Sequence, residues 1–284
     1  MKSHARSVII GGGAMGVGLL YHLAKEGWKD VVLIEKGELT SGSTWHAAGL
    51  IPHFIGSLNM AKIHFYGADL YKKLEEETGQ ATGWHGCGAI RLALDQDQVD
   101  WFHYVKGVLD QVGAECHLLG PDEIRKVHPL LETDGFLMGA YTTGDGHTDP
   151  SGATQAMAVG ARNRGAEIYL NNRVTDTKLL PSGEWEVITE KGTIICEHLV
   201  NAAGSFCEQV GSMAGIKVPM VNMVHQYLMT ETIPEVAALE KELPVVRDPR
   251  ASCYYRQEQS GLIIGPYEMN AKAWGLDGID WSFD

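Results

Sequence analysis

The N-terminal part of the chain alternates between short apolar runs and one amphipathic stretch. Residues 7–10 form an apolar run that predicts a short buried strand. Residues 14–26 carry three leucines in one helical stripe and are followed by Gly27, which suits the end of a helix. Residues 30–34 are apolar again and predict a second strand. A strand, a glycine-rich turn, a helix and a strand in this order predict one βαβ unit.

Beyond this unit, the pattern predicts further helices and strands. Residues 40–49 are small and polar, which favours a loop that a ligand can approach closely. Helices are expected at residues 58–78, 97–112, 121–127 and 150–164. Strands are expected at residues 87–94, 166–170, 173–180, 185–189, 193–196, 199–202, 223–230, 253–257 and 262–265. Because β-rich blocks are interleaved with helical ones, we expect two domains that are each built from non-contiguous segments.

Composition narrows the class of protein. Apolar residues make up 44% of the 284 positions, and the net charge of −13 disfavours binding to nucleic acid or to an anionic membrane surface. The sequence has no apolar run of about 18 residues and no pattern typical of a signal or transit peptide, so we expect no membrane span and no such leader. The five cysteines include no C-x-x-C pair. We therefore expect reduced thiols in a reducing compartment and a cytoplasmic location.

The glycine-rich turn has the spacing of a dinucleotide-binding motif. Gly11 would permit the tight turn, Gly13 would let backbone N–H groups approach a pyrophosphate, and Gly16 would let the helix and strand pack closely. Glu35 follows Gly16 by 19 residues, at the end of the second predicted strand. A carboxylate there accepts hydrogen bonds from ribose hydroxyls and repels a ribose phosphate, which disfavours NADP. The small hydroxyl-rich residues 40–44 favour FAD over NAD, because they suit a long cofactor that passes close to the peptide backbone.

One further segment identifies a family. Ser43-Thr44-Trp45-His46-Ala47-Ala48-Gly49-Leu50 resembles dimethylglycine dehydrogenase and sarcosine dehydrogenase, of the D-amino-acid-oxidase-like flavoproteins. The resemblance also covers residues 11–16, 35–36, 74–79, 144–150, 201–204, 225–227, 254–258 and 265–268. It implies an α/β fold in which an FAD-binding Rossmann-like domain of the glutathione-reductase type is interleaved with a β-rich α+β substrate domain. The implied segments are 1–82 and 144–214 for the FAD-binding domain and 83–143 and 215–284 for the substrate domain.

The resemblance implies how the cofactor is held. A covalent bond is expected between His46 and the flavin 8α-methyl group, which would retain the cofactor and raise its reduction potential. Phe206 stands where the family often has Trp, and Cys207 follows it in place of a small residue. The cofactor-binding residues implied in full are Gly11, Gly13, Ala14, Met15, Gly16, Glu35, Lys36, Gly42, Ser43, Thr44, Trp45, His46, Ala47, Ala48, Gly49, Leu50, Val174, Ala203, Gly204 and Phe206.

The implied reaction is oxidation of the N-methyl group of a small amine such as dimethylglycine or sarcosine. A hydride passes to flavin N5 and leaves an iminium, from which water releases formaldehyde or a folate captures the one-carbon unit. The amine must be neutral to assist hydride departure, so a group that accepts the ammonium proton is needed. His225 resembles the family's active-site histidine, and Tyr254 is the second expected catalytic residue. Arg256, on the same face of a predicted strand as Tyr254, pairs either with a substrate carboxylate or in a structural ion pair.

Further expectations concern the remaining histidines, the electron acceptor and the alternative functions. The loop that contains His147 fits either a metal site or a turn held by Asp and His hydrogen bonds; we favour the turn and expect no metal. Trp84, His85, His53 and His64 are further candidates for the pocket lining. Electron-transfer flavoprotein or oxygen is the expected electron acceptor, within choline and glycine betaine catabolism. Relatives of this family continue well beyond this length, so we expect a truncated chain whose tetrahydrofolate domain is absent. A non-catalytic regulatory flavoprotein and an NAD-dependent dehydrogenase are the alternative functions.

Overall fold

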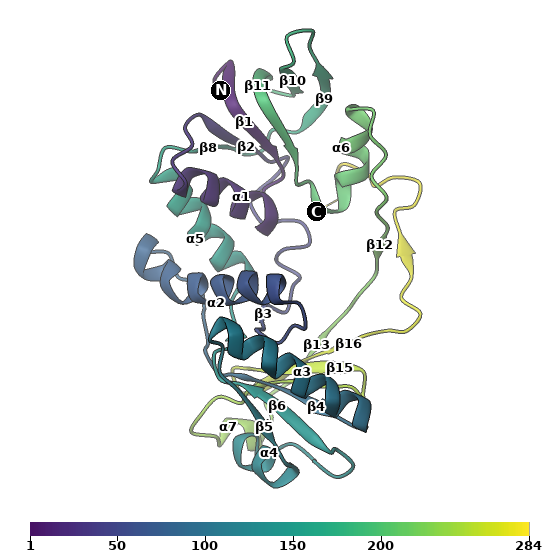
Figure 1. Ribbon diagram of the computed structural model, residues 1–284. Coiled ribbons are helices and arrows are strands. Elements are labelled where there is room, and N and C mark those ends of the chain that lie inside the picture. The colour runs from purple at the N-terminus through teal and green to yellow at the C-terminus, as the bar shows by residue number, and fades with distance from the viewer. Residues whose placement is uncertain (284) are drawn as a thin grey trace.

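The two large β-sheets lie at opposite ends of the molecule, and the longer helices lie between them (Figure 1). A computed structural model describes residues 1–283. Both sheets draw strands from segments that are far apart in the sequence, so neither forms from one continuous stretch.

The first sheet is built on parallel pairing. β1 pairs in parallel with both β2 and β11, and β8 extends the sheet beyond β2. All four residues of β2 are buried, as expected for a parallel strand that is covered on both faces. In spatial order the strands are β8 (Glu167–Tyr169), β2 (Val31–Ile34), β1 (His4–Ile10), β11 (Gly192–Asn201), β10 (Trp185–Thr189) and β9 (Val174–Leu179).

Successive residues of the central strands point into two different cores. Ile9 and Leu33 pack with α1 (Ala14–Lys25) and α5 (Pro150–Arg162) on one face of the sheet. Val8, Ile10, Val32 and Ile34 point to the other face, where they meet the β9–β10 strands and α6 (Cys207–Met213). A short 3₁₀ turn, η1 (Gly204–Phe206), leads from β11 into α6. The period of two in these apolar residues therefore buries both faces of the first sheet.

The second sheet is mostly antiparallel. α3 (Gln96–Val112) covers one face through Phe102, Val105 and Leu109, and α4 (Pro121–Val127) covers the other through Ile124. In spatial order its strands are β13 (Leu228–Met229), β16 (Gly261–Pro266), β15 (Cys253–Glu258), β14 (Val245–Asp248), β4 (Ala89–Ala93), β6 (Met138–Thr142) and β5 (Cys116–Leu119).

A long helix and a short pair of strands lie between the two large sheets. α2 (Leu58–Thr78) lies between the sheets and contacts both α5 and α3 (Figure 1). It begins where the Ser57 hydroxyl accepts a hydrogen bond from the Met60 amide and ends at Gly79, which is left-handed with φ 73°. The small remaining elements are β3 (Leu50–Ile51) paired with β7 (Gly146–His147), β12 (Asn222–Met223) paired with β17 (Ala273–Trp274), and α7 (Pro234–Ala237).

The predicted α/β fold class is confirmed, and most predicted helices and strands are present within a few residues of their expected bounds. The predicted strands 193–196 and 199–202 are one strand, because pairing with β1 continues through the polar residues between them. The predicted strand 223–230 is wrong: only its ends are extended, and they pair in different sheets. Strands β3, β5, β6, β7, β14 and β17 and helices α6 and α7 were not predicted. Among the described residues no helix combines the length and apolarity that crossing a bilayer requires. The four-segment domain division stays a prediction.

Candidate functional site

A cavity of about 750 Å³ opens where the parallel strands of the first sheet end. β1, β2 and β11 contribute the residues that follow their carboxyl ends, which is the edge where open α/β sheets bind ligands. Many of the residues expected to bind a cofactor line this cavity together with the expected catalytic His225. They are Gly11, Gly13, Ala14, Met15, Glu35, Lys36, Gly42, Ser43, Thr44, His46, Val174, Ala203, Gly204 and Phe206.

The glycine turn at the cavity floor tolerates no side chain at two positions. Gly11 has φ +116°, and a Cβ there would lie 2.3 Å from the carbonyl oxygen of Ala202. A Cβ on Gly16 would lie 2.0 Å from the carbonyl oxygen of Gly11. Gly16 itself is buried and does not line the cavity. The close packing of helix and strand therefore requires both glycines, in the roles expected of the first and third glycine of the motif.

The positive end of α1 faces the cavity. Gly13 precedes the helix and has no side chain to cap it, and no acidic residue lies in the first turn. The Ala14 amide donates to Thr44 Oγ1 at 3.0 Å, while Met15 is 82% exposed at the mouth. A helix N-terminus that faces open space and carries no acidic side chain is suited to bind a phosphate.

Glu35 is held firmly at the end of β2. Its Oε2 accepts a hydrogen bond from the Gly12 amide at 2.6 Å, and its Oε1 accepts one from the Gly37 amide at 2.8 Å. Each oxygen keeps a further lone pair, so the carboxylate can still accept a ribose hydroxyl. Phe206 stacks on Trp281, with ring centroids 4.9 Å apart, and closes the same wall of the cavity.

Different residues of the loop that carries His46 line two neighbouring cavities. His46 is exposed to the large cavity, its Nδ1 lies 3.3 Å from the carbonyl oxygen of Gly42, and its ring lies 3.7 Å from that of Trp45, centroid to centroid. Trp45 and Ala47 instead line a neighbouring cavity of about 500 Å³. Ala48, Gly49 and Leu50 line neither cavity, so these expected cofactor residues are not grouped with the rest.

The two expected catalytic residues are linked through a third side chain. His225 Nδ1 hydrogen-bonds Glu268 Oε2, and its ring lies 6.0 Å from that of Tyr267. The Tyr267 ring in turn lies 5.7 Å from that of Tyr254. Burial raises the pKa of Tyr254, which therefore stays protonated near neutral pH. Hydrogen bonds from its own backbone amide and from His225 hold the pKa of Glu268 below its usual value, although burial opposes them.

Tyr254 sits away from the wall of the large cavity but in a fixed position. A Cβ on Gly265, its partner across β15 and β16, would lie 2.1 to 2.4 Å from atoms of the Tyr254 ring, so the ring lies across this glycine. Tyr255 points to the other face, where it packs with Ile90 and Val246, as strand alternation predicts. Gly265, Tyr267 and Glu268 lie in the segment 265–268 that the resemblance covered, but no role was expected for them from the sequence.

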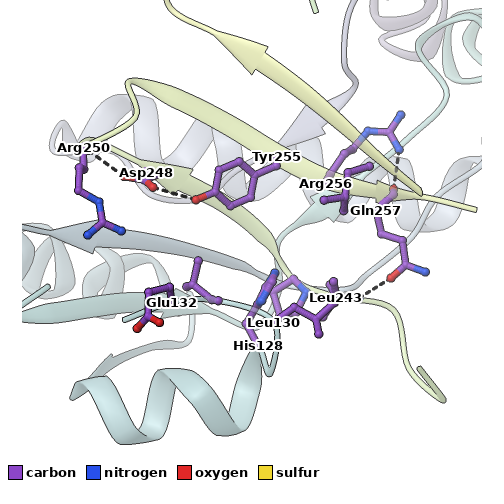
Figure 2. A pocket seen from close by; sticks show the side chains of 12 residues that line it. His128, Leu130, Glu132, Leu243, Asp248, Arg250, Tyr255, Arg256 and Gln257 are labelled. Atoms are coloured by element: carbon purple, nitrogen blue, oxygen red, sulfur yellow. Dashed lines mark hydrogen bonds between the residues drawn. The ribbon is translucent and has the colours of Figure 1, made fainter. Parts of the chain in front are cut away.

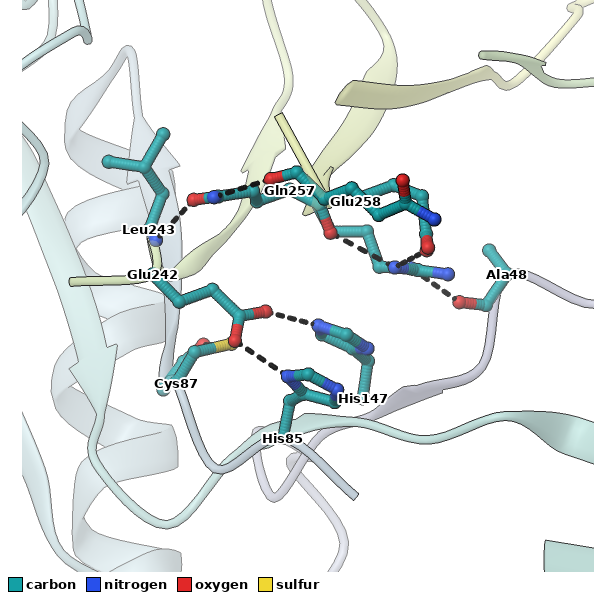
Figure 3. Close-up of polar contacts among 11 residues, drawn as sticks. Ala48, His85, Cys87, His147, Glu242, Leu243, Gln257 and Glu258 are labelled. Carbon is teal, nitrogen blue, oxygen red and sulfur yellow. Dashed lines mark hydrogen bonds and ion pairs between the residues drawn. The ribbon is translucent and has the colours of Figure 1, made fainter. Parts of the chain in front are cut away.

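Arg256 is engaged by the protein itself. Its Nε donates to the carbonyl oxygen of Ala48 at 2.9 Å, and its Nη1 lies 2.6 Å from Glu258 Oε2 (Figure 3). The side chain is 8% exposed. Of the two expected roles, the structural ion pair is the one present, and the arginine fastens the second sheet to the loop that carries His46.

A second polar cluster lies in the neighbouring cavity. Glu242 accepts from His147 Nε2 at 2.5 Å and from His85 Nδ1 at 2.7 Å, and the two imidazoles stack with centroids 4.7 Å apart (Figure 3). The three ligand-type atoms lie within 4.8 Å of one another, an arrangement that spacing around His147 did not predict. Asp149 caps α5 by accepting from the amides of Ser151 and Gly152. Asp149 therefore holds the turn as expected, whereas His147 bonds Glu242 from outside the loop and belongs to a three-residue clasp that could also hold a metal ion.

His53, His64 and Trp84, which were also expected to line the pocket, contact other parts of the protein instead. His53 is buried, and its ring Nδ1 lies 2.5 Å from Asp145 Oδ1. His64 Nδ1 lies 2.7 Å from the carbonyl oxygen of Pro52. Trp84 lies beside the Lys72 ammonium, 5.7 Å from ring centroid to nitrogen. Of this group only His85 lines one of the two cavities described above.

A separate cavity of about 250 Å³ lies on the face of the second sheet that α4 covers (Figure 2). His128 is buried there, its Nδ1 has no hydrogen-bond partner among the described residues, and burial lowers its pKa to about 4. The Tyr255 hydroxyl donates to Asp248 Oδ2 at 2.9 Å. Apart from Arg256, none of the residues expected to be functional lines this cavity.

Comparison with known proteins places these features in a family. The family model described as FAD dependent oxidoreductase, abbreviated DAO, matches residues 6–283. Dimethylglycine dehydrogenase from Rattus norvegicus is 47% identical over 99% of this chain and 34% of its own length. Sarcosine dehydrogenase from Homo sapiens is 36% identical over 99% of this chain and 32% of its own length.

Two further relatives bear on the range of functions. The pyruvate dehydrogenase phosphatase regulatory subunit of Mus musculus is 32% identical over 96% of this chain and 31% of its own length. Among solved structures, L-proline dehydrogenase from P. horikoshii superposes with a TM-score of 0.85 and 28% identity, covering all of this chain and 75% of that one. The chain thus spans about a third of the length of the dehydrogenases that it matches.

Proposed function

The chain belongs to the DAO family of FAD-dependent oxidoreductases, and from this premise we propose that it binds FAD in the large cavity and oxidises the N-methyl group of a small amine. One observation carries the proposal: the glycine turn, His46 and His225 come from three distant segments and line the same cavity. Dimethylglycine and sarcosine are the proposed substrates, since the relatives at 47% and 36% identity are named for them.

The residues of the cavity fit FAD. The N-terminus of α1 would hold the pyrophosphate, and Glu35 would accept hydrogen bonds from the ribose. Thr44 and the other small residues of the loop would lie along the cofactor and leave room for His46 to reach the flavin ring. Bound FAD supplies a two-electron acceptor, while the protein binds and orients the amine.

His46 is the proposed point of covalent attachment. Its imidazole is exposed to the cavity rather than buried in a core, and its hydrogen-bonding contact with the carbonyl oxygen of Gly42 is long. A nitrogen of this imidazole would hold the flavin through its 8α-methyl carbon. Because such a link is covalent, the flavin would stay attached to the chain after denaturation.

His225 is the proposed proton acceptor for the amine. The contact with Glu268 occupies Nδ1, which leaves Nε2 as the nitrogen that takes the ammonium proton. Tyr254 would donate a hydrogen bond toward the substrate, since its raised pKa keeps the hydroxyl protonated. The neutral amine can then release its hydride, and water or a folate would receive the one-carbon unit.

The electron acceptor and cellular context are proposed with the reaction. Electron-transfer flavoprotein or oxygen would reoxidise the cofactor, and the cytoplasm is the proposed location. Stopped-flow mixing of the reduced protein with each acceptor in turn separates the two: the physiological acceptor restores the oxidised flavin spectrum at a rate that supports turnover.

A regulatory role is the second candidate function, because one relative at 32% identity is named as a regulatory subunit. Anaerobic addition of dimethylglycine or sarcosine distinguishes the two functions. Loss of the oxidised flavin absorbance supports catalysis, whereas a loaded protein with an unchanged spectrum supports regulation.

The covalent link is tested by denaturing electrophoresis of the FAD-reconstituted chain, viewed by flavin fluorescence. We expect a fluorescent band in the wild type and in the control His103→Ala, an exposed histidine on α3. The band should be absent in His46→Ala. A fluorescent band that persists in His46→Ala would contradict the link, and failure of every variant to take up FAD would contradict the proposed function itself.

A further inference from the structure

Two histidines and one glutamate from three distant segments of the chain meet in the cavity of about 500 Å³. Glu242 Oε1 lies 2.5 Å from His147 Nε2, and Glu242 Oε2 lies 2.7 Å from His85 Nδ1 (Figure 3). These nitrogen and oxygen atoms all lie within 4.8 Å of one another. Two imidazoles and a carboxylate are a donor set that binds divalent transition metals such as zinc.

The two histidines are held side by side by their own backbones. The His85 amide donates to the carbonyl oxygen of His147 at 2.8 Å, and the His147 amide donates to that of His85 at 3.0 Å. Residues that exchange both hydrogen bonds in an antiparallel pair have their side chains on the same side, so the imidazoles stack with an interplanar angle of 10°. A Cβ on Gly146 would lie 2.0 Å from the carbonyl oxygen of His85, so this close approach requires a glycine. The main chain therefore aims both imidazoles before any ligand binds.

Strand register brings Glu242 to the histidine pair. β14 and β4 are parallel, and Val245 at the start of β14 pairs with Ala89 at the start of β4. His85 precedes Ala89 by four residues and Glu242 precedes Val245 by three, so both side chains lie just before the two paired strands begin. The Leu243 amide donates to a glutamine side chain of β15 at 3.0 Å, which fixes the backbone next to Glu242.

The distances fit a zinc ion after a small movement. Ligand atoms about 2.0 to 2.2 Å from a tetrahedral zinc lie about 3.3 to 3.6 Å from one another, so opening the contacts of Glu242 by roughly 1 Å makes room for the ion. The His147 side chain is 7% exposed and stays in place, whereas His85 is 52% exposed and Glu242 is 27% exposed, so these two can move. A neutral imidazole can carry its hydrogen on either nitrogen, so the nitrogen that faces Glu242 can offer its lone pair to the ion.

The fourth position of the ion faces open space. The cavity that the three residues line has room for a water molecule on the ion. Three protein ligands and a water are typical of zinc sites with an exchangeable position, whereas closed structural sites have four protein ligands. Trp45 and Ala47, on either side of His46, line the same cavity, so the ion would lie beside the loop that carries the proposed flavin attachment.

Two other carboxylates line this cavity, and both are engaged elsewhere. Asp149 accepts hydrogen bonds from the amides of Ser151 and Gly152 in the first turn of α5. Glu258 pairs with Arg256 at 2.6 Å. Water is therefore the expected fourth ligand.

We propose that His85, His147 and Glu242 bind a zinc ion, with water in the fourth position. The site lies outside the large cavity and does not depend on the proposed flavin chemistry. Mg²⁺ is disfavoured because it takes oxygen ligands in octahedral geometry, and Fe²⁺, which the same donor set binds, stands below zinc in the order of affinities. From the sequence we expected no metal, because only strand register brings these three positions together.

The test is zinc binding to the tag-free chain after dialysis against a chelator. Isothermal titration should show one zinc ion bound per wild-type chain and no binding of Mg²⁺. Loss of a ligand in His85→Ala or in Glu242→Gln should weaken zinc binding about 100-fold or more, since even the loss of a residue that only orients a ligand costs about 10- to 100-fold. His117→Ala is the matched control and should bind as the wild type does, because exposed His117 also pairs with a carboxylate, that of Glu115 at 2.9 Å, but belongs to no three-ligand group among residues 1–283.

Cobalt gives a second measurement that does not depend on stability. Co²⁺ takes the place of zinc, and its visible absorption at wavelengths beyond the flavin bands reports the ligand geometry. We expect bands of a four-coordinate ion in the wild type and in His117→Ala, and their loss in His85→Ala. The His85 side chain is about half exposed, so its removal leaves the core intact, and circular dichroism of the metal-free variant checks the fold.

The outcomes are distinct. Zinc that binds the wild type no more tightly than the folded His85→Ala and Glu242→Gln variants overturns the site and leaves a hydrogen-bonded clasp. Equal affinity for zinc and Mg²⁺ overturns the choice of metal. Because metal binding is measured without an amine, either result leaves the proposed oxidation standing.

Discussion

Glu242 is the centre of the clasp in the neighbouring cavity, and Glu242→Gln tests how much that clasp contributes to stability. A hydrogen bond to a charged group contributes about 1.5 to 3 kcal/mol and a neutral one about 1 kcal/mol. The amide removes the charge from two contacts, of which the one to His85 is half exposed and correspondingly weak. We therefore expect a loss of about 1 to 3 kcal/mol in the free energy of unfolding.

This loss converts into a measurable shift in melting temperature. An unfolding entropy of about 2.1 cal/mol/K per residue, over 284 residues in one cooperative transition, gives about 0.6 kcal/mol per degree. Glu242→Gln should therefore lower Tm by about 2 to 5 °C at neutral pH. The matched control is Glu240→Gln, an exposed acid two residues earlier, which should leave Tm unchanged.

The pH dependence gives a sharper test of the same residue. Burial alone would raise the pKa of Glu242, but the hydrogen bonds from His147 and His85 outweigh it and the pKa lies below the usual 4.5. A carboxyl with a depressed folded-state pKa stabilises the fold above its unfolded pKa, and this contribution is lost as the pH falls through the folded value. The Tm difference between wild type and Glu242→Gln should therefore shrink below about pH 4.5. A difference that is absent at neutral pH, or that persists unchanged in acid, would refute the reasoning.

These differences are expected in the metal-free protein. A zinc-dependent rise in wild-type Tm that Glu242→Gln abolishes would show that Glu242, His85 and His147 form the metal site inferred above.

Three further substitutions follow from single contacts. Gly11→Ala should abolish FAD retention or soluble expression, because its Cβ would lie 2.3 Å from a backbone oxygen at a φ of +116°, whereas Gly18→Ala, with nearest contact at 3.8 Å inside α1, should not. Tyr21→Phe should cost about 1.5 to 3 kcal/mol by urea unfolding, because the fully buried hydroxyl donates to Glu77 at 2.8 Å. His128→Leu should flatten the acid limb of the stability curve: burial lowers the pKa of His128 from 6.5 to about 4, so the unfolded chain takes up the proton first and wild-type stability falls across that window. An equally steep limb in His128→Leu would contradict this.

Features that depend on a few neighbouring residues could be predicted from the sequence. The glycine turn requires Gly11 and Gly16 because of contacts within one strand, turn and helix, and the spacing of those glycines is visible in the sequence. The long α2 helix carries its own boundaries, since Ser57 caps its start and Gly79 ends it. In such cases the local backbone geometry and the residue type select each other.

Features that depend on strand register could not be predicted in the same way. Arg91 and Arg247 are more than 150 positions apart in the sequence, and only the parallel pairing of β4 with β14 brings them side by side. The predicted strand 223–230 failed for a related reason, because its two ends pair with strands of different sheets. Apolar alternation predicts that a segment is extended, but the partner that it will pair with is decided by the packing of the whole domain.

The loop that carries His46 shows how the two ends of the molecule depend on each other. The carbonyl oxygen of Ala48 accepts a hydrogen bond from Arg256, which belongs to the second sheet, and the carbonyl oxygen of Gly49 accepts one from the amide of Thr148, beside α5. A Cβ on Gly49 would lie 2.0 Å from the carbonyl oxygen of Thr148, so the loop has no freedom to shift there. The histidine proposed to hold the flavin is thus positioned from both sheets at once. We therefore expect the proposed attachment of the flavin to depend on contacts from both ends of the molecule, and a substitution of Arg256 to disturb it.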